Sequence, residues 1–178
     1  MLTSERLFLR PIVQSDCASL FSIYGDPKTN AFNPSGPYPD LVYTQSVLDR
    51  WTKHWDEYGF GHWAIISPQE SKEVIGFGGI TVRDFLGTEI NNLGYRLGVN
   101  GWGKGFATEF CRTVIEFGFN QLGLTTISAT VRENHIASQR VLEKAGLHFE
   151  NSVKDIPDAP KSLVFNLSKQ EWQATSSR

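Results

Sequence analysis

Three glycines at alternate positions, Gly101, Gly103 and Gly105, form the segment of this sequence best suited to chemistry. An apolar stretch ending at Val99 precedes them and an amphipathic stretch follows, which predicts a turn between a strand and a helix. The first turn of a helix leaves backbone N–H groups without intrahelical partners and carries partial positive charge. Because Gly103 and Gly105 bring neither bulk nor a capping side chain, we expect these N–H groups to bind the oxygens of a phosphate.

Two other phosphate-binding motifs are excluded because residues that they require are missing. A P-loop starting at Gly98 would need Ser or Thr, to hold magnesium, where Gly105 stands. A dinucleotide fingerprint would need a further glycine at Phe106 or Thr108. A plain tight connection between strand and helix is the remaining alternative, and three glycines exceed what such a turn needs.

The rest of the chain predicts the strands and helices that hold this turn. Apolar residues at helical spacing predict one helix after an N-cap at Ser15 and a second that carries Trp51 and Trp55. The longest helix follows the glycines and ends near Gly123, and another, over 137–145, is closed by Gly146. This order predicts one domain, residues 1–178, with an α/β (or α+β) fold on one mixed sheet. Strands are expected over 6–10, 62–66, 73–82, 90–99, 125–131, 147–153 and 162–167.

Composition narrows the function classes. Of the 178 residues, 40% are hydrophobic, which suffices for the core of one domain. The net charge of −2 gives no basic footprint, so no nucleic-acid partner is expected. No stretch approaches about 18 consecutive apolar residues, and the start lacks the apolar segment of a secretory signal, so we expect a cytoplasmic protein without a membrane span. Cys17 and Cys111 are expected to be reduced and buried, with no metal site.

The glycine turn resembles the pyrophosphate loop of the GNAT N-acetyltransferases, Gln/Arg-x-x-Gly-x-Gly/Ala. Asn100–Gly105 follows that pattern with Asn in the first place. Gly94–Leu97 and Trp102–Glu109 are similar to Gly-Tyr-x-Leu and Trp-Gly-Lys-Gly-Tyr/Phe-Ala-Thr-Glu of one branch, the ribosomal-protein N-terminal (alanine/serine) acetyltransferases. A second motif of the family resembles Asn134–Ser138 followed by Lys144–Leu147, with Leu in place of Phe. The resemblance covers essentially the whole chain.

The resemblance implies a GNAT-like fold, in which a mostly antiparallel mixed sheet has a V-shaped splay between two central strands and helices on both faces. It implies acetyl-CoA as the cosubstrate, no metal, and direct transfer of the acetyl group to an amine. In such a fold pantetheine pairs with the backbone of Leu97 and Val99 like an added strand. A backbone N–H near Leu97 stabilises the oxyanion. The pyrophosphate accepts hydrogen bonds from the backbone N–H groups of Gly103, Lys104, Gly105, Phe106 and Ala107.

Asn134 and Ser138 gain roles from the same resemblance. From the residues alone, Asn134 is typical of a helix cap and Ser138 of an ordinary helix position. The family uses these positions on pantetheine and on the leaving sulfur, so Ser138 is the candidate to hydrogen-bond or protonate the departing thiolate. Leu97 and Ser138 are therefore the candidate catalytic residues. The candidate cofactor-binding residues are Leu97, Val99, Gly103, Lys104, Gly105, Phe106, Ala107, Asn134 and Ser138.

The general base is not assigned by the sequence. Many relatives carry Glu at the place of Asn92, whose amide cannot usefully accept a proton. The region of Asp155–Asp158 corresponds to a place where the ribosomal-protein relatives carry another carboxylate, without a clean match. Glu89, Glu150, His54, His62 and a chain of water molecules are the other candidates.

The favoured interpretation is an acetyl-CoA-dependent N-acetyltransferase that acts on a peptide or protein N-terminal α-amine. A small-molecule amine acetyltransferase, for a polyamine, an antibiotic or an amino acid, is one alternative. A non-catalytic acetyl-CoA-binding module is another, because Glu is missing at Asn92. A homodimer is also left open. An acceptor cleft could be walled by aromatic residues, most of which are expected in the core: Phe32, Tyr38, Trp51, Trp55 and Trp63.

Overall fold

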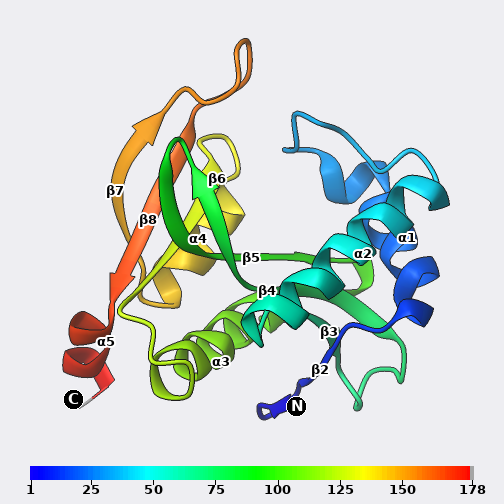
Figure 1. Ribbon diagram of the computed structural model, residues 1–178, viewed down its shortest axis with the longest axis horizontal. Helices are drawn as coiled ribbons and strands as arrows, with labels where there is room; N and C mark the ends of the chain where they lie inside the picture. Colours follow the sequence, from blue (N-terminus) through cyan, green and yellow to red (C-terminus); the bar gives the residue numbers. More distant parts are fainter. Residues whose placement is uncertain (177–178) are drawn as a thin grey trace. The chain divides into compact units, whose positions relative to one another are not determined.

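The computed structural model describes residues 1–176 of the chain. The order of elements reproduces the predicted one and adds a short strand at the start and a helix at the end (Figure 1). The elements are β1 (Leu2–Thr3), β2 (Phe8–Pro11), η1 (Gln14–Asp16), α1 (Cys17–Tyr24), η2 (Pro27–Asn30), α2 (Leu41–Tyr58), β3 (His62–Ile66), β4 (Val74–Phe85), β5 (Thr88–Leu97), η3 (Val99–Gly101), α3 (Phe106–Asn120), β6 (Thr126–Arg132), α4 (Ile136–Lys144), β7 (His148–Val153), β8 (Ser162–Ser168) and α5 (Lys169–Ser176).

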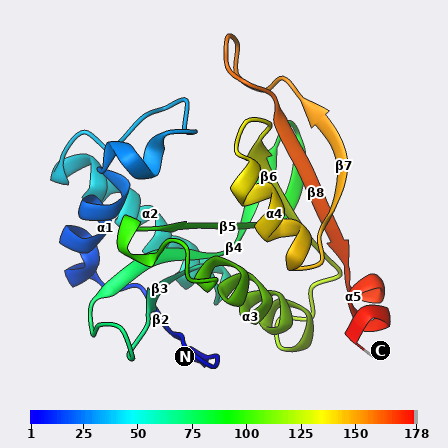
Figure 2. The same cartoon turned by 180° about the vertical axis from the view of Figure 1, so that it is seen from behind.

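The contacts of the chain divide it into two compact units. The first comprises Met1–Gly79 and Tyr95–Ala107, and the second comprises Ile80–Gly94 and the chain from Thr108 onward. β4, β5 and α3, which are labelled in Figure 2, each have residues in both units. Each unit is therefore described separately.

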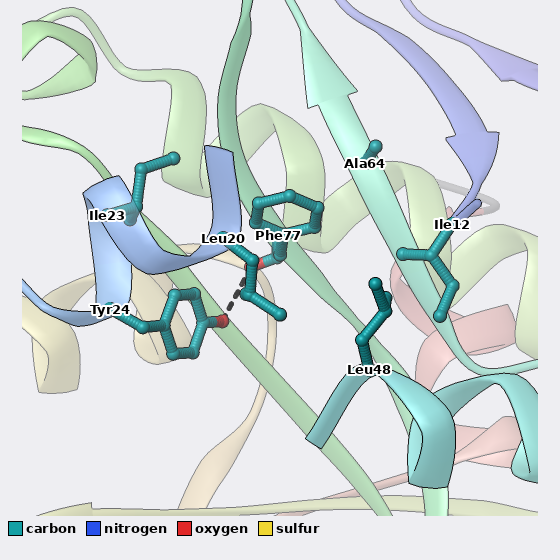
Figure 3. Packing of buried hydrophobic residues seen from close by; sticks show 7 residues of the cluster. All are labelled: Ile12, Leu20, Ile23, Tyr24, Leu48, Ala64 and Phe77. Atoms are coloured by element: carbon teal, nitrogen blue, oxygen red, sulfur yellow. Dashed lines mark hydrogen bonds between the residues drawn. The ribbon is translucent and has the colours of Figure 1, made fainter. Parts of the chain in front are cut away.

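The first unit is built from antiparallel strands covered by two helices. Leu9 of β2 lies opposite Ile65 of β3, and Ala64 of β3 lies opposite Phe77 of β4. α1 and α2 contribute the fully buried Leu20 and Leu48 to the same core. Figure 3 shows this cluster, with the Tyr24 hydroxyl donating a hydrogen bond to the Phe77 carbonyl at 3.4 Å. Its members are Ile12, Leu20, Ile23, Tyr24, Leu48, Ala64 and Phe77.

Most of the aromatic residues considered for an acceptor cleft belong to this core, as expected. Tyr38, Trp51 and Trp55 pack against the cluster, and Trp63 is 4% exposed. The Trp55 indole donates to the His62 carbonyl at 2.7 Å. Phe32 differs from these residues, because its side chain is 40% exposed.

The start of α1 differs from the sequence prediction. The N-cap is Asp16 rather than Ser15, and a 3₁₀ turn precedes it. The Asp16 carboxylate accepts hydrogen bonds from the Val13 N–H at 2.8 Å and from the Arg10 guanidinium at 2.8 and 2.9 Å. A buried carboxylate requires a paired cation, and Arg10, six residues earlier on β2, supplies it.

The second unit begins with the hairpin between β4 and β5. Leu86 and Gly87 both have positive φ, 52° and 86°, which is the backbone of a tight two-residue hairpin turn. β6 pairs antiparallel with β8 along its whole length, from Thr126↔Ser168 to Arg132↔Ser162, and β7 pairs with the other edge of β8. α4 lies alongside β6 (Figures 1 and 2). Residues buried on α3 include Phe110, Val114 and Phe119.

The strand order is β1-β2-β3-β4-β5-β6-β8-β7, a mixed and mostly antiparallel sheet of the kind expected. β5 and β6 run parallel and have a single registered pair among the described residues, Asn92↔Ser128. The predicted α/β fold with a mixed sheet is confirmed.

The sequence prediction missed the last helix, α5, although the residues at its start form a capping motif. The Ser168 hydroxyl accepts from the Glu171 N–H, and the Glu171 carboxylate accepts from the Ser168 N–H, each at 3.1 Å. This is a capping box, Ser-x-x-Glu. Within residues 1–176 no helix has both the length and the apolar character needed to cross a bilayer.

Candidate active site

The predicted phosphate loop is a turn held by its own backbone in the first unit. β5 ends at Leu97, η3 follows, and α3 begins at Phe106. The N–H groups of Gly101 and Trp102 donate to the carbonyls of Gly98 and Val99, at 2.8 and 3.1 Å. These bonds close the first half of the turn.

Gly103 and Gly105 are required by the shape of this backbone. Their φ angles are +73° and +80°, a region that other residues rarely adopt. Both residues are exposed, as is Lys104 between them. The loop is therefore accessible, and it leads into a helix whose first N–H groups have no intrahelical acceptor. This geometry suits an anion.

One strand boundary was predicted wrongly. The strand was expected to continue to Val99, but β5 ends two residues earlier and Val99 begins η3. The Val99 carbonyl accepts the Trp102 N–H, so Val99 takes part in the turn rather than in the strand. Leu97 is therefore the last residue of the strand.

Hydrogen bonds hold the backbone at Leu97, the last residue of β5. The following residue, Gly98, donates its N–H to the Ile75 carbonyl at 2.8 Å, and the Trp102 indole donates to the Leu97 carbonyl at 3.1 Å. A Cβ at Gly76 would lie 2.6 Å from both the Arg96 carbonyl oxygen and the Leu97 side chain. Gly76 is therefore needed for the close approach of β4 to the end of β5. The side chain of Leu97 is 6% exposed.

Arg6 lies on the loop and was not predicted as a site residue. Its Nη1 donates to the Lys104 carbonyl at 2.7 Å, and its guanidinium lies over the Phe106 ring, 4.6 Å from the centroid. Lys104 itself extends to Glu70, with 2.8 Å between Nζ and the carboxylate. Arg6 stands 98 residues from Lys104 in the sequence, so no local pattern could have linked them.

Asn134 and Ser138 lie together in the second unit, at the junction of β6 and α4. The N-cap of α4 is His135. Asn134 therefore does not cap this helix, as was considered from the sequence. Asn134 is exposed, and Ser138 is half-buried one turn into the helix. Gln139 fixes the junction, because its side-chain amide donates to the carbonyls of Arg132 and Glu133 at 3.1 and 3.0 Å.

The structure thus groups the predicted residues in two sets. The residues from Leu97 to Ala107 form one loop in the first unit, and Asn134 and Ser138 share one turn in the second. A model of the acetyltransferase (GNAT) domain family matches residues 6–148, four-fifths of the chain. The chain belongs to the GNAT acetyltransferases.

Similar proteins share this GNAT assignment. An uncharacterized N-acetyltransferase, p20, of Bacillus licheniformis is 30% identical over 96% of this chain and 97% of its own length. The structure of an acetyltransferase from Agrobacterium tumefaciens is 27% identical, with a TM-score of 0.77 over 93% of this chain and 92% of its own. The aminoglycoside acetyltransferase AAC(6')-Ib in complex with ribostamycin and coenzyme A has a TM-score of 0.78 at 18% identity, over 96% and 98% of the two chains.

The predicted enzyme class and cosubstrate are therefore confirmed at the level of the family. The protein is a GNAT acyltransferase that uses acetyl-CoA. The loop from Gly103 to Ala107 fits the phosphates of that cosubstrate, because it combines two exposed glycines of positive φ with the start of α3. Among the described residues no group of three His, Cys, Asp or Glu side chains is arranged to hold a metal ion.

Three carboxylates considered as the general base of this GNAT enzyme are engaged elsewhere or exposed. Asp155 pairs with Arg132 at 2.9 Å and accepts from the Ser162 hydroxyl. Partial desolvation raises the pKa of Asp155, but the hydrogen bonds from Ser162 and Arg132 outweigh it, and the net shift is downward. Glu150 is exposed beside His148, and Glu89 is exposed in β5. The lowered pKa of Asp155 disfavours it as a base near neutral pH.

The two candidate histidines are packed into the first unit. The His62 ring stacks on Trp51 with 3.6 Å between centroids, and its Nδ1 is buried with no hydrogen-bond partner among the described residues. Burial, with a smaller contribution from nearby His54, lowers the pKa of His62 from 6.5 to about 3. His54 contacts the Phe60 carbonyl through Nδ1 at 2.8 Å. We infer that His62 is a neutral core residue.

His62 should give the protein a pH-dependent stability. Between pH 6.5 and about 3 the unfolded chain binds a proton that the folded chain does not, so stability is lost as pH falls through this window. Replacing His62 with Phe keeps an aromatic ring on Trp51 and removes the titration. The free energy of unfolding, from urea titrations at pH 7, 6, 5 and 4, should then fall less steeply than in the wild type, by up to roughly 1.4 kcal/mol per pH unit. Parallel curves for the two proteins would contradict this assignment.

Asn92 carries an unsatisfied polar atom in the second unit. Its Oδ1 is buried and has no hydrogen-bond partner among the described residues. Its register partner on β6, Ser128, donates from Oγ to Asn166 at 2.6 Å. An amide oxygen in this state can accept a hydrogen bond from a water molecule or an amine. It cannot remove a proton from either.

Proposed function

We propose that this enzyme acetylates the α-amino group of a peptide or protein N-terminus. The observation that carries the proposal is the buried, unpaired carbonyl oxygen of Asn92, at a place where the resemblance to the family implies a glutamate in many members. An acceptor that is already partly neutral needs no strong base. An α-amino group, with a pKa of about 7.7–8.0, meets that condition at pH 7, whereas a lysine side chain near 10.4 does not.

The proposed reaction is a direct transfer. The neutral amine attacks the thioester carbonyl, a backbone N–H near Leu97 stabilises the oxyanion, and the C–S bond breaks as the C–N bond is completed. The amine proton leaves to water held near Asn92, and the CoA thiolate takes a hydrogen bond or a proton from Ser138. Holding the amine against the thioester supplies much of the rate. We assign pantetheine to the Leu97 backbone and Asn134, and the pyrophosphate to the N–H groups from Gly103 to Ala107.

The charge next to Leu97 disfavours a polycationic acceptor. Arg96 lies over the Tyr24 ring, 4.5 Å from its centroid, and donates to the Asn30 side chain at 2.7 Å. Both partners are neutral, so neither cancels the charge of the guanidinium. A spermidine or an aminoglycoside would bring several positive charges toward this cation at the end of β5. A peptide N-terminus brings one.

The structural neighbours include enzymes of both acceptor classes. AAC(6')-Ib is an aminoglycoside acetyltransferase, and a structure described as a "putative ribosomal-protein-serine acetyltransferase" from Vibrio cholerae has a TM-score of 0.73 at 17% identity, over 94% of this chain and 96% of its own. Both structures are similar to this chain in fold only, so their similarity does not distinguish between the two classes of acceptor. The motifs Gly94–Leu97 and Trp102–Glu109 favour the ribosomal-protein branch. We also propose that residues 1–178 act as one domain, since the family match from 6 to 148 includes residues of both units.

A peptide with two amines tests the acceptor. The peptide carries a free α-amine and an internal lysine, and fragmentation mass spectrometry locates the acetyl group after incubation with acetyl-CoA. We expect acetylation of the α-amine, and blocking that amine should abolish turnover. Acetyl groups found only on the lysine would refute the pKa argument. Turnover of spermidine or an aminoglycoside, without turnover of any peptide, would establish the small-molecule alternative.

A further inference from the structure

We propose that Arg96 selects the acceptor by binding a carboxylate on the second residue of the peptide, next to the residue whose α-amine is acetylated. The inference rests on the proposed function, because it takes the acceptor to be a peptide that reacts beside Leu97. Arg96 directly precedes Leu97 at the end of β5. The enzyme should therefore prefer peptides with Asp or Glu at the second position.

Hydrogen bonds centred on Asn30 orient the Arg96 side chain. Asn30 is 5% exposed, and its side-chain nitrogen donates to the carbonyls of Tyr24 and Asp26, at 2.8 Å each. Its Oδ1 accepts from Arg96 Nη1 at 2.7 Å and from the Asn33 side-chain amide at 3.0 Å. Turning the Asn30 amide over would set its nitrogen against these donors and its oxygen against the carbonyls. The amide therefore has one orientation, and it holds the guanidinium in one place.

The Tyr24 ring supports the guanidinium at a second point. The Arg96 Cζ lies 4.5 Å from the centroid of this ring. Tyr24 is 7% exposed, and its hydroxyl donates to the Phe77 carbonyl (Figure 3). The ring of Tyr38, one of the aromatic residues considered for an acceptor cleft, packs on Tyr24 with 5.3 Å between centroids. The guanidinium is therefore fixed before an acceptor binds, which lowers the entropy cost of binding.

No acidic side chain among the described residues pairs with Arg96. A guanidinium has five N–H donors, and within residues 1–176 the Asn30 oxygen is the acceptor for one of them. Arg96 is half-buried all the same. Two other half-buried arginines, Arg10 and Arg132, each pair with an aspartate, at 2.8 and 2.9 Å. A cation partly removed from water is costly without an anion, so a carboxylate of the acceptor would supply what the chain itself does not.

The chemistry and the place of Arg96 both favour a carboxylate close to the reacting amine. The donors that Arg96 does not use can take the two oxygens of a carboxylate together. Neighbouring residues of a strand lie about 3.3 Å apart, and the same spacing separates the residues of an extended peptide. With the thioester assigned to the Leu97 backbone, Arg96 stands one residue from the reacting centre. The second residue of the peptide stands one residue from the reacting amine, which brings its side chain within reach of Arg96.

Two peptides that differ only in the second residue test this preference. Both begin with Ala and have the same length, and the second residue is Glu in one and Gln in the other. In the wild type kcat/KM should be about 10- to 100-fold higher for the Glu peptide, because hydrogen bonds between charged groups are stronger than those to a neutral amide. Arg96→Gln should lower kcat/KM for the Glu peptide to the level of the Gln peptide, with KM for acetyl-CoA unchanged.

Two further variants separate binding of the carboxylate from a structural role. Arg96→Lys keeps a cation without the paired donors and should keep part of the preference. Lys53→Gln removes an exposed charge from α2 and should keep all of it. Equal kcat/KM for the two peptides in the wild type would overturn the proposal. So would a preference that survives in Arg96→Gln, or an equal loss on both peptides in that variant. A wild type that acetylates neither peptide would overturn the proposed function, and this inference with it.

Discussion

Replacing Gly105 with Asp should abolish measurable CoA binding under conditions where the wild type binds tightly. The substitution puts a carboxylate at an exposed point of the loop assigned to the pyrophosphate, beside the start of α3. It repels the diphosphate and offers the first N–H groups of the helix an internal acceptor. Losing a few charge-assisted hydrogen bonds, at about 1.5–3 kcal/mol each, corresponds to orders of magnitude in Kd. Isothermal titration calorimetry with CoA measures the loss.

The φ of +80° at Gly105 requires a control that separates strain from charge. Gly105→Asn has nearly the same shape as the Asp variant, tolerates this backbone region better than most residues, and carries no charge. It should bind CoA more weakly than the wild type but clearly more tightly than the Asp variant. Gly36→Asp introduces the same residue at another glycine of positive φ, +72°, with open space around it, and should bind CoA normally. A folded Gly105→Asp protein that binds CoA like the wild type would exclude this loop as the phosphate site.

Replacing Ser138 with Ala should lower kcat by roughly 10²- to 10⁴-fold if the hydroxyl protonates the leaving thiolate. A smaller loss is expected if it only orients the sulfur. The Kd for CoA should change little, because the residues that we propose for the diphosphate lie on another part of the chain. Steady-state kinetics with thiol detection, together with CoA titration calorimetry, separate the two parameters.

A matched variant identifies the hydroxyl as the cause of the Ser138 effect. Ser138→Thr keeps a hydroxyl at the same position of α4 and should retain more activity than Ser138→Ala, at equal thermal stability. An unchanged kcat in Ser138→Ala would return Ser138 to the role of an ordinary helix residue. A loss of kcat that accompanies unfolding, and that Thr fails to recover, would likewise contradict a chemical role.

Local signals were sufficient for most of the elements. The stripe that includes Val47, Leu48, Trp51 and Trp55 predicted a helix, and α2 has that face buried or half-buried. Gly103 and Gly105 predicted a tight turn between a strand and a helix, and both adopt the positive φ that only glycine tolerates well. These predictions succeeded because apolar spacing and glycine conformation depend on neighbouring residues. The ends of the elements were predicted less accurately. Val99 was placed in the strand but begins a 3₁₀ turn, because the spacing of apolar residues does not change where the strand ends.

The sequence by itself therefore determined the fold class, the tight turn at Gly103 and Gly105, and the membership of the family. Tertiary structure decided which charged residues are available for chemistry. It placed Arg6 on the Lys104 carbonyl, paired Asp155 with Arg132, and buried His62 against Trp51. Each of these depends on residues distant in sequence meeting in space. Their electrostatic energies depend on distance and burial, which no local pattern encodes.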